Sequence, residues 1–245
     1  MKSFENQSRK VELRIREGVN TSDYYSDTLL ESLIPFLEGY PEGKSLLEIG
    51  SGRGYISIVL AKRYRDLQVI ATDIDEAALT LSAENVGLND LSDRITIRKG
   101  SLYEPAQHES FDLIVAVPPQ IPLTREQLAT LPHEIEGYHA TTSIAGPTGR
   151  NVINPLISQA RQHLIPGGII CFVHGDFSDP QESLEQLTAA GLKAFEIGSR
   201  DKLLSETTLT RHAKEFIERS GYTFKKDSDG KDYFTIRVLV GLRSD

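Results

Sequence analysis

The sequence has little of what disulfide-rich, cysteine-metal and membrane proteins need. Cysteine occurs once in 245 residues, at Cys171, so neither an intrachain disulfide nor a cysteine-rich metal site can form. Cys171 lies within the apolar run 168–173, which favours a packing role over a nucleophile. No apolar stretch is long enough for a membrane span, and residues 1–10 lack the apolar core of a signal peptide. We therefore expect a soluble, cytoplasmic protein with no membrane partner.

The net charge of the chain indicates which kinds of macromolecule it is expected not to bind. A net charge of −8 argues against a protein whose main task is to bind phosphate backbones, so we expect no nucleic-acid partner. Hydrophobic residues make up 39% and charged residues 25% of the chain, which is ordinary for a globular protein. Its length fits one large α/β domain with a short appended segment. The sequence does not set the oligomeric state, and a homodimer stays open.

From about Ser45 onward, short β-branched runs alternate with helical patterns. Several runs are almost wholly apolar, as in a parallel sheet that helices cover on both faces. This alternation predicts a Rossmann-like, doubly wound α/β fold with a mostly parallel seven-stranded sheet. The last strand follows a turn signal at 227–230 and is expected to be an antiparallel edge strand. Strands are expected at 45–49, 68–72, 94–99, 111–117, 168–174, 192–198 and 233–242, and helices at 55–64, 76–86, 152–164, 181–190 and 208–219.

Two stretches do not follow this alternation. Residues 1–43, helical around 28–37, are expected to form an N-terminal helical cap on the domain 44–245. Residues 120–150 form a long insert between the fourth strand and its helix, and such long connections are usually functional. Because ligands bind at the carboxyl ends of the strands in open α/β sheets, the insert is expected on the substrate side.

The first strand and its turn read Glu48-Ile49-Gly50-Ser51-Gly52-Arg53-Gly54-Tyr55. A dinucleotide-binding turn needs a small residue where Tyr55 stands, and the Lys-Ser/Thr pair of a phosphate loop is missing. The pattern acid-x-Gly-x-Gly-x-Gly instead resembles motif I of class I methyltransferases, which implies the cofactor S-adenosyl-L-methionine. The motif residues expected to bind it are Glu48, Gly50, Ser51, Gly52 and Gly54.

Further cofactor contacts are expected where the next strands end. Asp73 lies about 20 residues past the glycine loop, where an acid accepts hydrogen bonds from ribose hydroxyls. Ile74, the next residue, is also expected to contact the cofactor. Asp75 is better explained as the N-cap of the next helix. After the third strand, Ser101 can hydrogen-bond the adenine, although related methyltransferases often have an acid there, and Leu102 can pack against it.

After the fourth strand the sequence Val117-Pro118-Pro119-Gln120 resembles the release-factor glutamine methyltransferase family. Residues 27–30, 164–168 and 173–175 are also similar to that family, so the resemblance covers roughly residues 25–200 and implies its fold and cofactor. The segment Pro-Gln-Ile at 119–121, and Gly-Tyr-Ile-Ser-Ile at 54–58, look more like the methyltransferase domain of plant methionine S-methyltransferase. Val117 is expected beside the cofactor.

Two departures from the release-factor family bear on the acceptor. The family's asparagine, whose carbonyl accepts from the amide of a planar nitrogen target, is Val117 here, and its tyrosine is Gln120. The family's N-terminal helical domain is missing or much reduced. We therefore expect methyl transfer to sulfur or nitrogen of a small molecule, amino-acid-like or a secondary metabolite, rather than to a release factor.

The sulfonium is an activated methyl donor, so the protein needs mainly to align an acceptor and exclude water. A thioether needs no base, whereas an amine or hydroxyl more often does. The catalytic candidates are Gln120, His174 and Tyr25, and the substrate-side candidates are Tyr24, Pro118, Pro119, Tyr138 and His139. Glu134 is a further candidate for a base. His174 could equally be hydrogen-bonded to loop backbone, the two tyrosines could simply pack, and the prolines could only stop the strand. No metal-ligand spacing is evident.

Two other functions fit the same cofactor site. The cofactor's own amine could attack its γ-carbon, which would form azetidine-2-carboxylate and release methylthioadenosine. Alternatively, the chain could be a non-catalytic cofactor-binding subunit or a protein methyltransferase.

Overall fold

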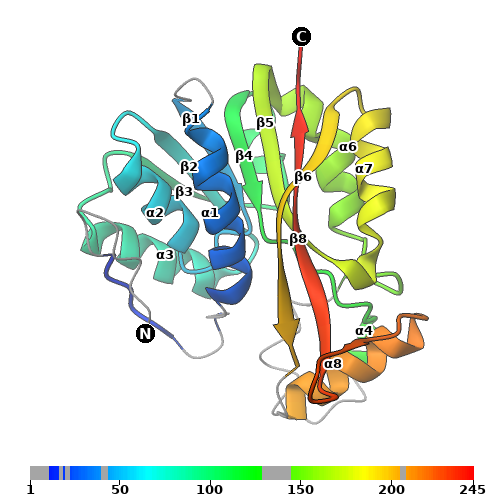
Figure 1. The fold of residues 1–245 in the computed structure, drawn as a ribbon. Coiled ribbons are helices and arrows are strands. Elements are labelled where there is room, and N and C mark those ends of the chain that lie inside the picture. Colours follow the sequence, from blue (N-terminus) through cyan, green and yellow to red (C-terminus); the bar gives the residue numbers. More distant parts are fainter. Residues whose placement is uncertain (1–10, 17–18, 20–22, 40–43, 129–144, 205–207) are drawn as a thin grey trace.

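The structure is a computed structural model that describes residues 11–16, 19, 23–39, 44–128, 145–204 and 208–245 (Figure 1). Within these ranges the strands form one eight-stranded sheet in the order β3-β2-β1-β4-β5-β8-β6, with β7 paired to β8. The strands are β1 (Ser45–Ile49), β2 (Gln68–Asp73), β3 (Ile95–Lys99), β4 (Phe111–Ala116), β5 (Leu164–Gly175), β6 (Lys193–Leu203), β7 (Lys225–Lys226) and β8 (Asp232–Leu242). The predicted fold class is confirmed.

The last strand corrects one detail of the prediction. β8 runs antiparallel to β5, as its preceding turn indicates, but it also pairs antiparallel with β6. It therefore lies inside the sheet, and β6 forms the edge in its place. The sheet has one strand more than the seven predicted, because β7, with only two residues, was not predicted.

Helices cover both faces of the sheet (Figure 1). One face packs against α1 (Asp23–Leu37), α2 (Tyr55–Arg63) and α3 (Glu76–Leu88), and the other against α6 (Ile153–Ala160) and α7 (Pro180–Ala189). Two further helices, α4 (Arg125–Leu128) and α8 (Thr208–Arg219), lie together beyond the lower end of the sheet in this view. Three short 3-10 helices, Glu104–Ala106, Arg161–His163 and Asp176–Ser178, join these elements.

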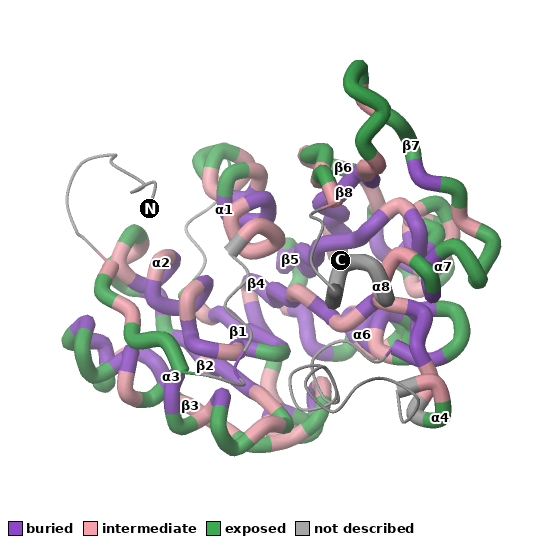
Figure 2. The backbone as a smooth tube through the Cα atoms, turned by 90° about the horizontal axis from the view of Figure 1, so that it is seen from below, coloured by how far each residue is buried: buried purple, intermediate pink, exposed green. Residues whose placement is uncertain are grey.

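The central strands are buried on both faces, which explains their almost wholly apolar sequences. Figure 2 shows these strands in purple, between helices whose exposed residues are green. Ile114 and Val115 of β4 are both 0% exposed, although their side chains point to opposite faces. Cys171 of β5 is equally buried, and burial raises the pKa of its thiol.

The N-terminal segment is part of this packing. Leu29, Leu30 and Leu33 of α1 are buried in the cluster under α2. Before α1, the backbone of residues 11–16 runs along the end of α3, where Arg14 N donates to Asn85 Oδ1 over 2.7 Å. The boundary drawn at residue 43 stays a prediction.

None of the helices in the described ranges is long and apolar enough to cross a bilayer. In the same ranges, no three His, Cys, Asp or Glu side chains gather as a group that could hold a metal ion.

Candidate cofactor and acceptor site

The glycine loop joins β1 to α2 at the carboxyl end of β1. Gly50 and Gly52 have φ of 75° and 53°, a region that residues with a Cβ rarely adopt. The backbone of β2 holds the loop, because Gly50 N and Ser51 N donate to Thr72 O over 2.8 and 2.9 Å. A Cβ added at Gly50 or Gly52 would meet no described heavy atom within 4 Å. One side of the loop is therefore open to a ligand.

Asp73, the last residue of β2, lies directly beside this loop. Gly52 N donates to Asp73 Oδ2 over 2.9 Å, and Asp75 N donates to Oδ1 over 3.0 Å. Burial raises the pKa of Asp73, and these backbone hydrogen bonds oppose the rise. Each carboxylate oxygen can accept a second hydrogen bond, so ribose hydroxyls could still be bound. Asp75 caps α3, since its side chain accepts from Ala77 N.

Glu48 of β1 lies beneath the loop and not on its open side. Its side chain is 2% exposed and accepts from both the backbone N–H, over 3.0 Å, and the hydroxyl of Ser57 in α2. Burial raises the pKa of Glu48 to about 8. The carboxyl therefore fixes the start of α2 against β1 beneath the loop, and its contact with the cofactor stays a prediction.

The remaining predicted cofactor residues surround the open side and fit a nucleoside. The Ser51 hydroxyl is buried and has no hydrogen-bond partner among the described residues. Ile74 is 53% exposed, so its side chain is available to an aromatic ring. Ser101 is exposed and Leu102 is half-buried where β3 ends, and Gly100 N donates to Asp73 O over 3.0 Å, which joins that end to β2. The Asp73 carboxylate and the side chains of Ile74, Ser101 and Leu102 thus lie along one edge. Gly54 packs against α3, since a Cβ there would lie 2.6 Å from Ser82 Oγ.

His174 of β5 does not face this edge. Its side chain is 0% exposed, with Nδ1 2.8 Å from Gly175 O and Nε2 2.9 Å from Ser183 Oγ of α7. Burial lowers the pKa of His174 to about 4, so the ring is uncharged at neutral pH. This is the arrangement of a histidine hydrogen-bonded to backbone, and the geometry gives no support to a catalytic role.

Gln120 is similarly occupied within the protein. The residue is 5% exposed, and its Oε1 accepts from Gly175 N at the end of β5. Its backbone O accepts from Ser178 Oγ over 3.0 Å. The amide therefore holds the loop after β4 onto the turn after β5, where it is not available to an acceptor.

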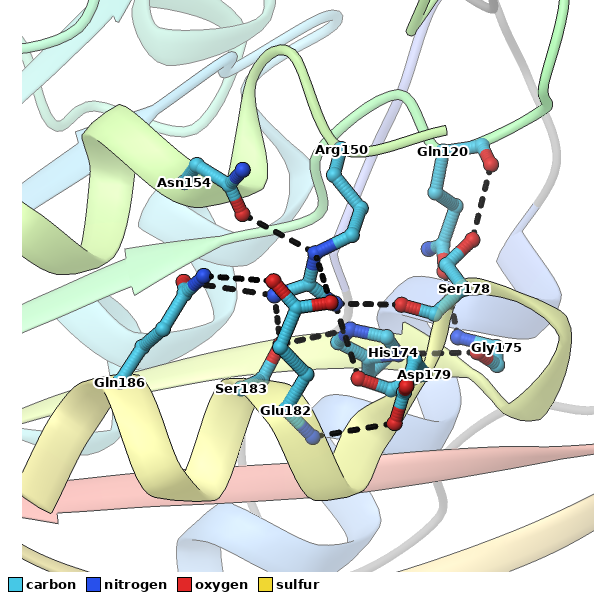
Figure 3. A network of polar contacts seen from close by, with 10 residues as sticks. All are labelled: Gln120, Arg150, Asn154, His174, Gly175, Ser178, Asp179, Glu182, Ser183 and Gln186. Carbon is cyan, nitrogen blue, oxygen red and sulfur yellow. Dashed lines mark hydrogen bonds and ion pairs between the residues drawn. The ribbon is translucent and has the colours of Figure 1, made fainter. Parts of the chain in front are cut away.

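Arg150, which the sequence analysis did not select, lies at the centre of the same network (Figure 3). The residue is 4% exposed and donates to Ser178 O, to Asp179 O over 2.8 Å and to Ser183 Oγ over 3.0 Å. Its Nε lies 3.2 Å from Glu182 Oε2. We call Gln120, Arg150 and the turn 175–179 the clasp, because both ends of the insert 120–150 are fixed on one turn.

The first turn of α1 brings the two candidate tyrosines to the carboxyl end of β6. Tyr24 OH donates to Asp201 O, and the Lys202 ammonium lies 4.4 Å from the centre of the Tyr25 ring. Burial raises the pKa of Tyr25. One turn further along α1, Asp27 Oδ1 accepts from Tyr55 OH over 2.9 Å, which links this helix to the residue after Gly54.

The other acceptor-side candidates follow β4. Val117 and Pro119 are half-buried and Pro118 is buried. Glu134, Tyr138 and His139 lie outside the described residues.

Comparison with known proteins places this geometry in a family context. Residues 17–132 match the family model described as "Methyltransferase small domain". A release factor glutamine methyltransferase from Xylella fastidiosa (strain Temecula1) is 33% identical over 61% of this chain and 53% of its own length. A ribosomal protein uL3 glutamine methyltransferase from Bradyrhizobium diazoefficiens is 33% identical over 51% of this chain and 39% of its own. The chain thus spans about half, or less, of these curated relatives.

Solved structures share the fold at low sequence identity. The YcgJ protein of Bacillus subtilis has a TM-score of 0.58 at 11% identity, covering 88% of this chain and 99% of its own. Precorrin-6y C5,15-methyltransferase of Geobacter metallireducens has a TM-score of 0.56 at 10% identity, covering 94% of this chain and 93% of its own.

The comparisons correct the expected acceptor. The curated relatives are named for protein substrates, ribosomal protein uL3 and release factors, so the expectation of a small-molecule substrate is wrong. That expectation relied on Val117 and on the short N-terminal segment, which are weaker evidence than similarity over more than half of the chain. The family match, the curated relatives and the fold together confirm the predicted resemblance: the chain has the class I methyltransferase fold and is related in sequence to the glutamine methyltransferases.

Proposed function

We propose that the chain is an S-adenosylmethionine-dependent methyltransferase that transfers a methyl group to nitrogen of a protein. The observation that carries this proposal is the similarity to two kinds of protein glutamine methyltransferase. The match to the methyltransferase family model, over residues 17–132, covers the glycine loop, Asp73 and the loop after β4. The open side of the glycine loop is where the proposed cofactor would bind.

Bound at this edge, the cofactor would supply a methyl group already activated on its sulfonium. Asp73 would accept hydrogen bonds from the ribose hydroxyls. Ile74 and Leu102 would pack against the base. Glu48 would act indirectly, by holding the start of α2 under the loop.

The loop after β4 suits an acceptor that carries N–H groups. Pro118 and Pro119 have no backbone N–H, and Val117 has an apolar side chain, so these three residues offer carbonyl oxygens and no side-chain donor. The donor of the next residue, Gln120 Nε2, lies 3.5 Å from both Pro118 O and Val173 O. Carbonyl oxygens can orient the hydrogens of an amide or amine nitrogen. The apolar side chains around them would exclude water from the methyl transfer. The absence of the family's asparagine then means that backbone carbonyls take over its role.

Incubation with methyl-labelled S-adenosylmethionine and purified bacterial uL3 or release factor tests this proposal. We expect label in a protein side-chain nitrogen, located by mass spectrometry, and none with the variant Asp73→Ala. Methylthioadenosine formed without any acceptor would instead support the cyclisation alternative. Cofactor binding with neither product would support the non-catalytic one, and either result would overturn the proposal.

A further inference from the structure

Lys202, near the end of β6, is a cation without a carboxylate partner in the part of the chain that the structure describes. Its ammonium lies 4.4 Å from the centre of the Tyr25 ring and 5.5 Å from that of Tyr24. The neighbouring carboxylate of Asp201 is engaged elsewhere, because it accepts from Thr235 Oγ1 over 2.8 Å. Two aromatic rings and the backbone of β6 therefore hold the charge in place.

The surrounding cations differ from Lys202 in this respect. Five described cations on β6, β7, β8 and α8 have an acidic partner, whereas Lys231, which is exposed before the start of β8, has no ion pair among the described residues. The pairs are Arg200 with Glu31 at 3.2 Å, Lys225 with Asp176 at 2.7 Å and Arg237 with Glu196 at 2.9 Å, and Lys214 and Lys226 both pair with Asp232. Lys202 thus differs from its paired neighbours in having no carboxylate, and from Lys231 in being half-buried.

The environment of Lys202 favours an anionic ligand. The side chain is half-buried, and burial lowers the pKa of its ammonium. A cation that has lost part of its hydration gains more from a carboxylate than a fully solvated one does, and the ring faces supply only part of that stabilisation.

The position of Lys202 indicates which molecule would supply the carboxylate. In the sheet order, β6 is separated from β1 by β4, β5 and β8, so Lys202 belongs to the half of the sheet away from the glycine loop. The link to the reaction site is α1, whose first turn holds Tyr24 and Tyr25 and whose Asp27 bonds Tyr55 beside the loop. An acceptor that reaches the loop after β4 could extend along α1 to Lys202.

We propose that Lys202, supported by Tyr24 and Tyr25, binds an acidic side chain of the protein acceptor. This inference rests on the proposed function, because it assigns the acceptor's side of the same site. It identifies a specificity determinant, a residue that binds the acceptor away from the methylated nitrogen.

Peptide binding tests the inference without requiring turnover. The probes are acetyl-Leu-Glu-Leu-Glu-amide and the matched acetyl-Leu-Gln-Leu-Gln-amide, titrated into the protein saturated with S-adenosylhomocysteine. We expect the glutamate peptide to bind about tenfold more tightly than the glutamine peptide, with an advantage that falls as salt is added. Lys202→Gln should abolish that advantage, and Lys202→Arg should retain most of it.

Lys193→Gln is the control, because it removes the same charge from an exposed site at the opposite end of β6. It should leave the advantage of the glutamate peptide unchanged. Equal binding of both peptides by the unaltered protein, or an equal loss in the two glutamine variants, would overturn the inference. Weaker S-adenosylhomocysteine binding by Lys202→Gln alone would also overturn it, by assigning the carboxylate to the cofactor. Failure of methyl transfer in the labelling experiment would be a separate result, which concerns the proposed function.

Discussion

Gly52 N donates a 2.9 Å hydrogen bond to Asp73 Oδ2, so the glycine loop and the acid that ends β2 form one structural unit. The two residues are 21 positions apart, and the parallel pairing of β1 with β2 brings them together. Removal of either partner should therefore affect both the cofactor contact and the shape of the loop.

Asp73→Ala should weaken S-adenosylmethionine binding by about 1.5–3 kcal/mol, the range for hydrogen bonds to a charged group. The matched control is Asp75→Ala, which removes the cap of α3 at a cost of about 1 kcal/mol in unfolding free energy but leaves Asp73 in place. Titration calorimetry gives the affinities, and thermal unfolding gives the stabilities. Equal affinity losses in the two variants would remove Asp73 from the cofactor site.

Gly52→Val should abolish cofactor binding in a protein that still folds. Valine at φ 53° costs about 1–2 kcal/mol of backbone strain, and its side chain would occupy the open side of the loop. Gly167→Val is matched to it, because Gly167 has φ 80° and an equally open Cβ position but lies near the start of β5. Calorimetry should show normal binding for Gly167→Val. If that variant lost binding as well, backbone strain would explain the effect and ligand contact would not.

The fold was largely predictable because its signals are local. Continuous apolar runs marked β4 and β5, and the Asp227–Gly230 turn indicated a strand that reverses direction. The insertion of β8 between β5 and β6 was not predictable, because it depends on pairing between segments more than 60 residues apart for β5. Most helix and strand boundaries differ from the prediction by few residues. The larger differences are the start of α1 at Asp23, the end of β6 at Leu203, and β5, which begins at Leu164 although Pro166 and two glycines follow.

In the candidate site, sequence patterns were informative only where a position requires one particular type of residue. Glycines at positive φ and an acid at a strand end are such cases. His174 and Gln120 are polar residues at the predicted ligand edge, but their hydrogen bonds go to Ser183 and to the backbone of Gly175. Arg150 gave no signal, since its partners come from a turn and a helix about 30 residues away. Buried polar networks form between distant segments, so sequence patterns do not reveal them.

His174 predicts a pH dependence of stability. The pKa of His174 is about 4 in the folded protein and about 6.5 when unfolded, so the unfolded state binds the additional proton as the pH falls below about 6.5. Folding stability is therefore lost as the pH drops from about 6.5 towards 4. From pH 7 to pH 5 the loss due to His174 should be about 2 kcal/mol.

Urea unfolding of the unaltered protein and of His174→Gln, each at pH 7 and pH 5, isolates the contribution of His174 to the unfolding free energy. Glutamine can still hydrogen-bond but does not titrate. The stability advantage of the unaltered protein over the variant should shrink by the stated amount at pH 5. A constant difference between the two proteins would show that the ring is not buried in its neutral form.

We predict that Arg150, as part of the clasp, positions the loop after β4 for the acceptor. Arg150→Met would leave the carbonyls of Ser178 and Asp179 without their buried donor, which should lower the unfolding free energy by about 1–3 kcal/mol. The insert would also lose its attachment at one end, while the glycine loop and Asp73 stay in place. We therefore expect a higher KM for the protein acceptor, with little change in cofactor affinity.

If Arg150 only stabilised the fold, its loss would not raise the KM for the acceptor. The variant Arg94→Met is the control that distinguishes this role from positioning of the acceptor. Arg94 also donates to three backbone carbonyls, those of Ala61, Tyr64 and Arg65, but at the amino end of β3 and the end of α2. Its loss should destabilise the protein to a similar degree without a change in acceptor KM. Steady-state kinetics well below the unfolding temperature compare the two variants. Equal KM values would mean that the clasp stabilises the fold but has no part in placing the acceptor.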